Sequence, residues 1–376
     1  MRTEPRVPEA ALSAIRTPFL TAAAERVDAP ILQPLGLLLD LAGESMRSRL
    51  FVVQAEGGAE ACLRPDFTVA VARQHLESGA AGGRYRYEGQ AFRAAPDGAQ
   101  PEEFLQFGLE QFGADSSLSP ALADAEIAAL AWESAVAGGR RDLTLWLGDI
   151  ALFAAFVEDM GLAEALAARL KRAAGRPRLL QAELARAGGE GEAAAGGIAD
   201  LLAGLSEAQA ADLLREIWAL AGIEPVGGRG PGEIAQRLIR RAEAARAPAL
   251  SLTQAEAVRR FLTISDAPEM AFDQVRALTS GVTPAMSAAL AGWSERLEQL
   301  TRQAPAERLR FATALGHAFD YYDGMTFEIR SDALDSHRPV AVGGRYDGLL
   351  ARLGGEATAA VGCMVRPWRA FAGGES

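Results

Sequence analysis

Four short stretches of the sequence combine polar, aromatic and glycine residues within strand-like surroundings. Charged and hydroxyl-bearing side chains set among apolar ones are more typical of a ligand site than of core packing. Together the four stretches predict a small-molecule pocket. They are Leu63-Arg64-Pro65-Asp66-Phe67-Thr68, Phe92-Arg93 with Gln106-Phe107-Gly108-Leu109-Glu110, Phe319-Asp320-Tyr321-Tyr322-Asp323-Gly324, and Gly343-Gly344-Arg345-Tyr346-Asp347-Gly348-Leu349.

Each stretch taken alone also fits a purely structural role. Asp66 or Thr68 can cap a helix that starts after a strand-end turn. Gln106 and Glu110 fall on one face of a strand, which solvent can cover. The tyrosines can lie in a turn, and Gly343-Gly344 can be a tight turn, because neither a P-loop nor a GxGxxG pattern surrounds it. No single stretch therefore establishes a ligand site, and the prediction depends on the order and spacing of all four.

Composition narrows the possible functions. The chain has 376 residues and a formal charge of −11, so its average surface repels nucleic-acid backbones. Two cysteines and three histidines show no metal-ligand spacing, and we expect no bound metal, no cofactor and no disulfide framework. The start of the chain is polar and no apolar run is long enough to span a membrane, which predicts a cytoplasmic protein.

The pattern of elements predicts an α+β protein with a discontinuous main domain. Helical periodicity covers residues 9–27 and 68–77, and strand patterns cover 50–54, 61–64, 84–92 and 103–112. Strand patterns resume at 308–314, 326–330 and 340–342, after a helix over 288–303. We therefore expect a core of residues 1–161 and 281–376, interrupted by a helical insertion over 162–280. The alanine-rich part of that insertion also fits a low-complexity spacer.

In order and spacing, these stretches resemble the class II synthetase core of histidyl-tRNA synthetase, over nearly the whole chain except the insertion. The resemblance implies an antiparallel sheet flanked by helices, with two cores paired about a twofold axis. The matching segments are Pro30-Ile31-Leu32-Gln33 for the first motif, 63–68 for LRPExT, 92–110 for the second motif, Phe319-Asp320-Tyr321-Tyr322 with Phe327-Glu328 for GLDYY…FE, and 343–349 for GGRYDGL.

The departures from the synthetase pattern fall on the residues that handle ATP. His317 stands where the family has an arginine, and the loop before Phe104 holds Gln100 and Glu102 in place of arginines. The third motif reads Arg366-Pro367-Trp368-Arg369 instead of GLER, so a long side chain fills the space of the adenine ring. Acidic residues beside a triphosphate are unfavourable. ATP-dependent aminoacylation is therefore expected to be lost, and no anticodon-binding domain is expected after Ser376.

The amino-acid half of the family pocket is better preserved. By the resemblance, Asp66, Thr68 and Gln106 receive the α-ammonium group of histidine, and Glu110 with Tyr322 binds the imidazole ring. The predicted histidine-like pocket comprises Asp66, Thr68, Arg93, Gln106, Glu110, Tyr321, Tyr322, Arg345 and Tyr346.

A chain that keeps this pocket and loses the ATP apparatus resembles the regulatory subunits of ATP phosphoribosyltransferase. The resemblance implies a non-catalytic partner of the short-form catalytic subunit, needed for the first step of histidine biosynthesis and for feedback inhibition by histidine, and a homodimer within a hetero-oligomer. The main alternative is a truncated ligase that forms an aminoacyl adenylate for a non-tRNA acceptor. A third possibility, an RNA-binding relic of a synthetase, is disfavoured by the charge of −11.

Overall fold

The structure, a computed structural model, describes residues 2–42, 44–54, 58, 60–95, 98, 100–113, 119–174, 176–188, 205, 207–221, 248–279, 283–315 and 321–374. These residues divide into two units. Unit 1 comprises Met1–Met160, Ala174–Arg176 and Arg260–Ser376, and unit 2 comprises Gly161–Ala173 and Pro177–Arg259. Within the described residues, no helix is both long enough and apolar enough to cross a membrane.

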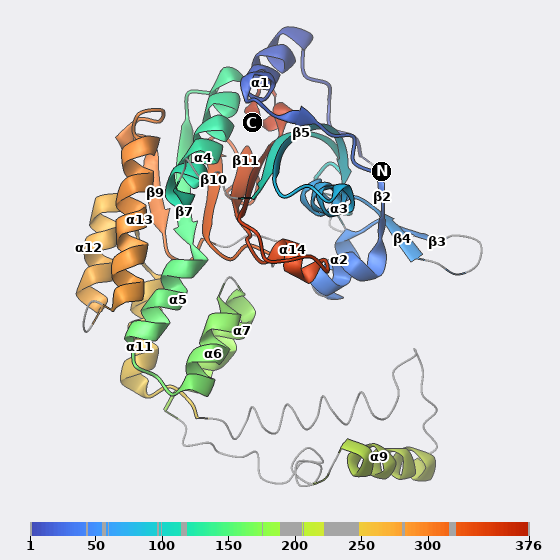
Figure 1. Cartoon of the computed structure of the whole chain (residues 1–376), viewed down its shortest axis with the longest axis vertical. Coiled ribbons are helices and arrows are strands. Elements are labelled where there is room, and N and C mark those ends of the chain that lie inside the picture. The colour runs from blue at the N-terminus through green and yellow to red at the C-terminus, as the bar shows by residue number, and fades with distance from the viewer. Residues whose placement is uncertain are drawn as a thin grey trace. The chain divides into compact units, whose positions relative to one another are not determined.

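A nine-stranded sheet forms the centre of unit 1 among the described residues (Figure 1). Its neighbouring strands run antiparallel except for the pairs β1/β5 and β7/β9, which are parallel. The α+β prediction of a mostly antiparallel core is confirmed. In spatial order the strands are β1 (Glu25–Arg26), β5 (Gly83–Phe92), β6 (Glu103–Phe112), β12 (Ala360–Val365), β11 (Ala341–Arg345), β10 (Met325–Ser331), β7 (Leu143–Asp149), β9 (Leu309–Ala312) and β8 (Ser265–Asp266).

A smaller sheet lies in the first third of the chain, with strand order β2-β4-β3. Leu32, Val52 and Val53 on its outer strands are exposed, although they are apolar. Its strands are β2 (Leu32–Pro34), β3 (Val52–Gln54) and β4 (Glu60–Leu63). Helix α2 (Leu35–Ala42) and the 3-10 helix η1 (Glu44–Arg49) lie between β2 and β3 in the chain, and α3 (Thr68–Ser78) follows β4.

The start of α3 differs from its predicted cap. The capping position is Phe67, whose side chain cannot accept a hydrogen bond, and the hydroxyl of Thr68 instead donates to a carboxylate on the large sheet. Both residues at the start of α3 are buried. The polar groups of this turn are therefore directed toward the sheet.

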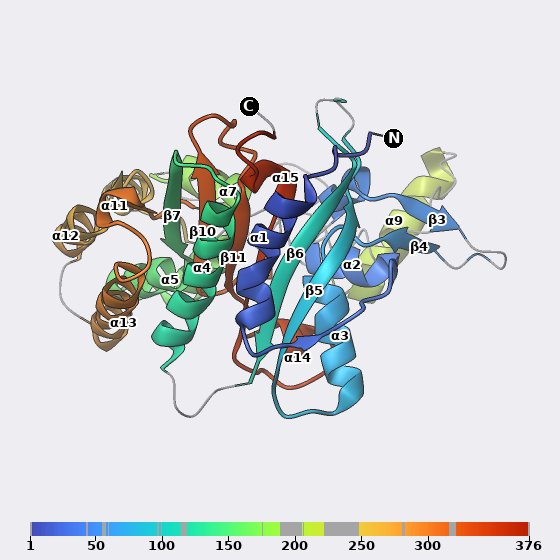
Figure 2. The ribbon, with the colours of Figure 1, turned by 90° about the horizontal axis from the view of Figure 1, so that it is seen from above.

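Alternation along β6 separates the two faces of the large sheet, because successive side chains of a strand point to opposite sides. On one face Phe107 is buried and contacts Arg16 of α1 (Glu9–Thr21). Helix α1 packs against α4 (Pro120–Ala137), and α4 packs against β11 and β12 (Figure 2). On the opposite face, Phe112 belongs to the same buried cluster as residues of α3. Gln106 and Glu110 share this second face and are buried, so they are not a solvated strand face.

An aromatic cluster and a buried helix cap connect the helices that pack near β7 and β9. Asp149 accepts hydrogen bonds from the first turn of α5 and from the indole of Trp293 at 2.7 Å. The Trp293 ring lies 5.5 Å from that of Phe272 and 4.9 Å from that of Phe311. The helices here are α5 (Ile150–Asp159), α12 (Pro268–Leu278) and α13 (Pro284–Leu300), and the shorter elements of the unit are η2 (Ala306–Arg308), α14 (Leu349–Arg352) and α15 (Pro367–Ala370).

The predicted insertion, 162–280, extends beyond unit 2 at its C-terminal end, because residues 260–279 belong to unit 1. Strand β8 pairs with β9, and Phe272 of α12 stacks near Phe311 of β9, so both elements are built onto the large sheet. In unit 2, Arg169 and Glu183 form an ion pair at 2.9 Å between α6 and α7. The helices of this region are α6 (Glu164–Ala173), α7 (Pro177–Ala185), α9 (Glu207–Ala221) and α11 (Leu252–Leu262).

Candidate ligand-binding site

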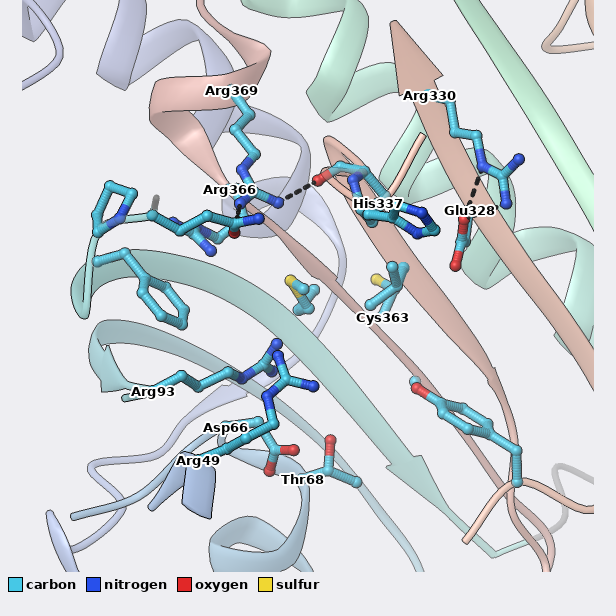
Figure 3. A pocket seen from close by; sticks show the side chains of 18 of the residues that line it. Arg49, Asp66, Thr68, Arg93, Glu328, Arg330, His337, Cys363, Arg366 and Arg369 are labelled. Atoms are coloured by element: carbon cyan, nitrogen blue, oxygen red, sulfur yellow. Dashed lines mark hydrogen bonds and ion pairs between the residues drawn. The ribbon is translucent and has the colours of Figure 1, made fainter. Parts of the chain in front are cut away.

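A cavity of about 800 Å³ lies in unit 1 (Figure 3). Six of the nine predicted site residues line it: Asp66, Thr68, Arg93, Glu110, Tyr321 and Tyr322. The wall also holds Arg49, Tyr87, Gln100, Phe104, Glu328, Arg330, His337, Cys363, Met364, Arg366 and Arg369, among others. Three of the four stretches therefore meet at one cavity, whereas no residue of the fourth stretch, 343–349, lines it.

Glu110 is surrounded by hydroxyl groups. Thr68 donates to Oε1 at 2.7 Å, Tyr87 donates to the same oxygen at 3.2 Å, and Tyr346 donates to Oε2. Burial raises the pKa of Glu110 to about 8, and the hydrogen bonds from Tyr346, Thr68 and Tyr87 only partly oppose this effect. At neutral pH the glutamate is mostly protonated and can donate as well as accept.

Glycines on two neighbouring strands leave room for this cluster. A β-carbon at Gly362 would collide with the carboxylate of Glu110, and one at Gly108 would collide with the ring of Tyr87. Tyr87 pairs across the sheet with Gly108, so its ring crosses β6 where no side chain stands and its hydroxyl reaches Glu110.

Asp66 lines the cavity with a buried carboxylate. The residue is 6% exposed, and no side chain of the described residues donates a hydrogen bond to its carboxylate oxygens. Burial raises its pKa to about 6, and the guanidinium of Arg93 and the backbone N–H groups of Val69 and Thr68 oppose the rise. A buried carboxylate of this kind is stabilised by a cationic group of a ligand.

Three tyrosine rings form one cluster, and two of them, Tyr321 and Tyr322, line the cavity. The ring of Tyr321 lies 4.7 Å from that of Tyr322 and 5.6 Å from that of Tyr346, and the last two are 5.9 Å apart. Burial raises the pKa of all three phenols, so they stay neutral hydrogen-bonding groups at physiological pH. The preceding residues of this motif, Phe319 and Asp320, and also His317, lie outside the described residues.

Three predicted site residues lie outside the cavity wall. The amide of Gln106 is buried and donates to the sulfur of Met364, which lines the cavity in its place. Arg345 points to the other face of the sheet, where it forms an ion pair with Asp124 at 2.7 Å. Tyr346 lies behind the wall, where it donates to Glu110 and packs against the rings of Tyr321 and Tyr322. Consecutive strand residues point to opposite faces, so Arg345 and Tyr346 cannot both face the cavity.

At the end of the cavity formed by the third motif, the lining groups contact one another. The guanidinium carbon of Arg366 lies 3.5 Å from the centre of the Phe104 ring, and Arg366 forms an ion pair with Glu4 at 2.5 Å. Arg369 donates to the side chain of Gln100 at 3.1 Å. Burial lowers the pKa of Arg366 to about 10, partly offset by Glu4, so the arginine stays charged at neutral pH. A planar ligand ring cannot stack on the face of Phe104 that the guanidinium covers.

Sequence reasoning missed two polar wall residues close to Glu110 and Asp66, namely Tyr87 and Arg49. A signal for Tyr87 exists in the sequence, because Tyr85 and Tyr87 alternate on a strand that pairs with the strand of Glu110. Arg49 stands outside every motif, and no sequence pattern indicates it. Within the described residues, no three side chains of His, Cys, Asp or Glu are arranged to hold a metal ion.

The chain is similar to known proteins over most of its length. A family model described as histidyl-tRNA synthetase matches residues 10–225 and 233–367. An ATP phosphoribosyltransferase regulatory subunit of Mesorhizobium japonicum is 36% identical over 91% of both chains, and one of Brucella anthropi is 35% identical over 88% of both chains.

The fold has a solved counterpart. A crystal structure described as an ATP phosphoribosyltransferase regulatory subunit/histidyl-tRNA synthetase from Bacillus halodurans superposes with a TM-score of 0.64 at 20% identity, covering 98% of this chain and 81% of that one. The chain therefore belongs to the histidyl-tRNA synthetase family and, by its relatives at about 35% identity, to the ATP phosphoribosyltransferase regulatory subunits.

Proposed function

We propose that this chain is a non-catalytic regulatory subunit that assembles with the short-form catalytic chain of ATP phosphoribosyltransferase and transmits feedback inhibition by histidine. The relatives that match about nine-tenths of the chain carry the name of that subunit. The proposal assigns the phosphoribosyl transfer to the catalytic chain and the sensing of histidine to the cavity described above.

One observation carries the proposal: Arg366 stacks on Phe104 and is paired with Glu4. By the family resemblance, this is the space in which a synthetase holds adenine. A charged pair between groups that are each less than a tenth exposed is costly to open. Arg366 thus covers the ring face on which a base would stack, which opposes aminoacyl-adenylate formation.

The amino-acid half of the cavity has the chemistry to hold free histidine. Asp66 matches an ammonium group, and the Glu110 cluster presents a carboxyl and phenols suited to both imidazole nitrogens. A ligand that binds two assembly states with different affinity shifts the balance between them, which is what feedback inhibition through a separate subunit requires.

We also propose that two copies of the chain pair through the small sheet, within a hetero-oligomer in the cytoplasm. Ile31, Leu32, Val52 and Val53 are apolar and between 39% and 54% exposed on or beside this sheet. Clustered exposed apolar residues mark association surfaces. The region that includes unit 2 is proposed to be a separate helical insertion, and no chemical role is assigned to it.

Histidine-dependent exchange of pyrophosphate into ATP separates this function from the ligase alternative. The purified chain should give no exchange above background, while a histidyl-tRNA synthetase assayed in parallel exchanges readily. Exchange at a rate near that of the synthetase would favour the ligase and contradict the regulatory assignment.

A further inference from the structure

We propose that residues 2–4, which precede α1, act as a strap that keeps the end of the cavity formed by the third motif closed to planar ligands. Glu4 of this strap holds Arg366 on the ring of Phe104. The inference rests on the proposed non-catalytic function and adds that a segment outside every sequence motif keeps a nucleotide base out of the cavity.

The strap is built onto the first residues of the large sheet's strand β6. Thr3 forms a parallel bridge with Glu103, and the N–H of Glu4 donates to the carbonyl of Glu103 at 2.9 Å. The N–H groups of Glu102 and Glu103 donate to the carbonyl of Arg2 at 2.8 and 3.2 Å. All these groups belong to the backbone, so they place the carboxylate of Glu4 beside the sheet independently of its ion pair.

The position of Arg366 depends on this carboxylate. Glu4 is 8% exposed and Arg366 3%, and the guanidinium donates to the carboxylate. Burial lowers the pKa of Arg366 and Glu4 opposes this effect, whereas the charges of Arg93 and Arg338 lower the pKa further. A buried cation that loses its counter-charge is strongly destabilised. Without the carboxylate, we therefore expect Arg366 to leave the ring of Phe104 for solvent.

Positive charge remains in the cavity wall, so a lack of cations does not explain the exclusion of a nucleotide. Arg93 and Arg369 line the cavity together with Arg366 (Figure 3). Guanidinium groups of this kind attract phosphates. The guanidinium of Arg366, however, covers the ring of Phe104 at 3.5 Å and takes the place of a stacked base. Exclusion therefore depends on the closed ring face, which Glu4 maintains.

Equilibrium dialysis with ATP tests the strap. Glu4→Gln should bind ATP at least about tenfold more tightly than the unmodified chain, because the amide has nearly the same shape and cannot neutralise Arg366. Inorganic tripolyphosphate carries the charge of the phosphates without the ring, so its gain in affinity should be smaller. An equal gain for both ligands would show that only a negative charge was removed, and would contradict the strap.

Glu9→Gln is the matched control. Glu9 lies in the first turn of α1, is exposed and pairs with Arg16 at 3.4 Å, so the same substitution removes the same charge away from Arg366. This control should bind ATP as the unmodified chain does, and a gain equal to that of Glu4→Gln would contradict the inference. A cooperative thermal unfolding transition shows that each variant is folded.

Arg366→Ala uncovers the ring directly and separates the two parts of the inference. If Arg366→Ala gains ATP binding and Glu4→Gln does not, Arg366 covers the ring without help from the strap, and the inference is wrong. If neither variant gains ATP binding, the inference is also wrong while the regulatory function stands. Binding of ATP by the unmodified chain as tight as by Glu4→Gln would overturn the closed end of the cavity for both proposals.

Discussion

Glu110 is the residue on which the proposed ligand site depends. Three hydroxyl groups converge on its carboxylate, and Gly362 leaves the space in which it lies. A buried acid that is mostly protonated at neutral pH can both donate and accept, which suits the two different nitrogens of a neutral imidazole.

Replacing this carboxyl should weaken histidine binding. In Glu110→Ala, the hydroxyls of Thr68, Tyr87 and Tyr346 lose their acceptor and the ligand loses a partner, which costs about 1–3 kcal/mol, or roughly ten- to a hundredfold in affinity. Calorimetry should report this loss while co-purification with the catalytic chain persists. Glu126→Ala, which removes the surface partner of Arg84, should leave histidine affinity unchanged. An unaltered histidine response in Glu110→Ala would mean that the effector binds elsewhere.

The raised pKa of Glu110 also predicts a dependence of stability on pH. The folded protein holds the proton up to about pH 8, whereas the unfolded chain releases it near pH 4.5. The stabilisation is therefore complete below about pH 4.5 and is lost progressively as pH rises toward 8. Compared with Glu110→Gln, the unmodified chain should lose at least about 1 kcal/mol between pH 5 and pH 8. Urea unfolding at both values measures the difference, and parallel curves for the two proteins would contradict it.

At the scale of single residues, the sequence motifs predicted several residues that line the cavity. They misplaced Arg345, whose side chain points to the other face of the large sheet. Asp66, Thr68, Glu110 and Tyr322 line the cavity as expected. Arg345, the last residue of β11, points toward α4, where it pairs with Asp124. Arg49 and Tyr87 were missed because their place in the wall depends on how distant elements pair across the sheet.

At the level of elements, a buried charge network holds α4, α13 and β11 together. Asp124 on α4 is fully buried and pairs with Arg296 of α13 at 2.6 Å and with Arg345 of β11 at 2.7 Å. The same Arg345 also pairs with Asp347. Because Tyr346 follows directly, this network fixes the strand end from which Tyr346 reaches Glu110.

Removing the central carboxylate should be strongly destabilising. Asp124→Ala leaves the buried guanidinium of Arg345 and the partly buried one of Arg296 without their shared partner, a change expected to cost about 3–5 kcal/mol of unfolding free energy. Asp273→Ala breaks an exposed pair with Arg276 and should cost less than about 1 kcal/mol. Chemical denaturation of both variants gives the comparison. Equal losses would show that the buried network adds nothing beyond a surface pair.

The ends of helices and strands were predicted best where the sequence pattern of the element is regular over many residues. Strand β6 spans 103–112 as the alternating pattern predicted. Helix α1 ends at Thr21 rather than 27, and α13 begins at Pro284 rather than 288, where Thr283 provides the cap. The short strand β8 has only two residues, too few for a periodic pattern, so the attachment of residues 260–279 to the sheet could not be read from sequence.

At the scale of the whole molecule, the exposed small sheet predicts self-association. Leu32→Asp places a charge on this apolar surface and should shift the protein from dimer toward monomer at micromolar concentration. Leu20→Asp is a fair control because Leu20 on α1 is exposed to the same extent, 54%. Sedimentation velocity distinguishes the species. A monomeric unmodified chain, or a dimer insensitive to Leu32→Asp, would contradict the predicted pairing surface.

The regulatory role is tested most directly by reconstitution. The short-form catalytic chain should be assayed for the condensation of ATP with phosphoribosyl pyrophosphate, alone and with this chain added, over a range of histidine concentrations. The account predicts that activity rises strongly on addition, that the two chains co-purify, and that histidine then inhibits the complex. Full activity of the catalytic chain without this one, unchanged in rate and in histidine response when it is added, would contradict the account.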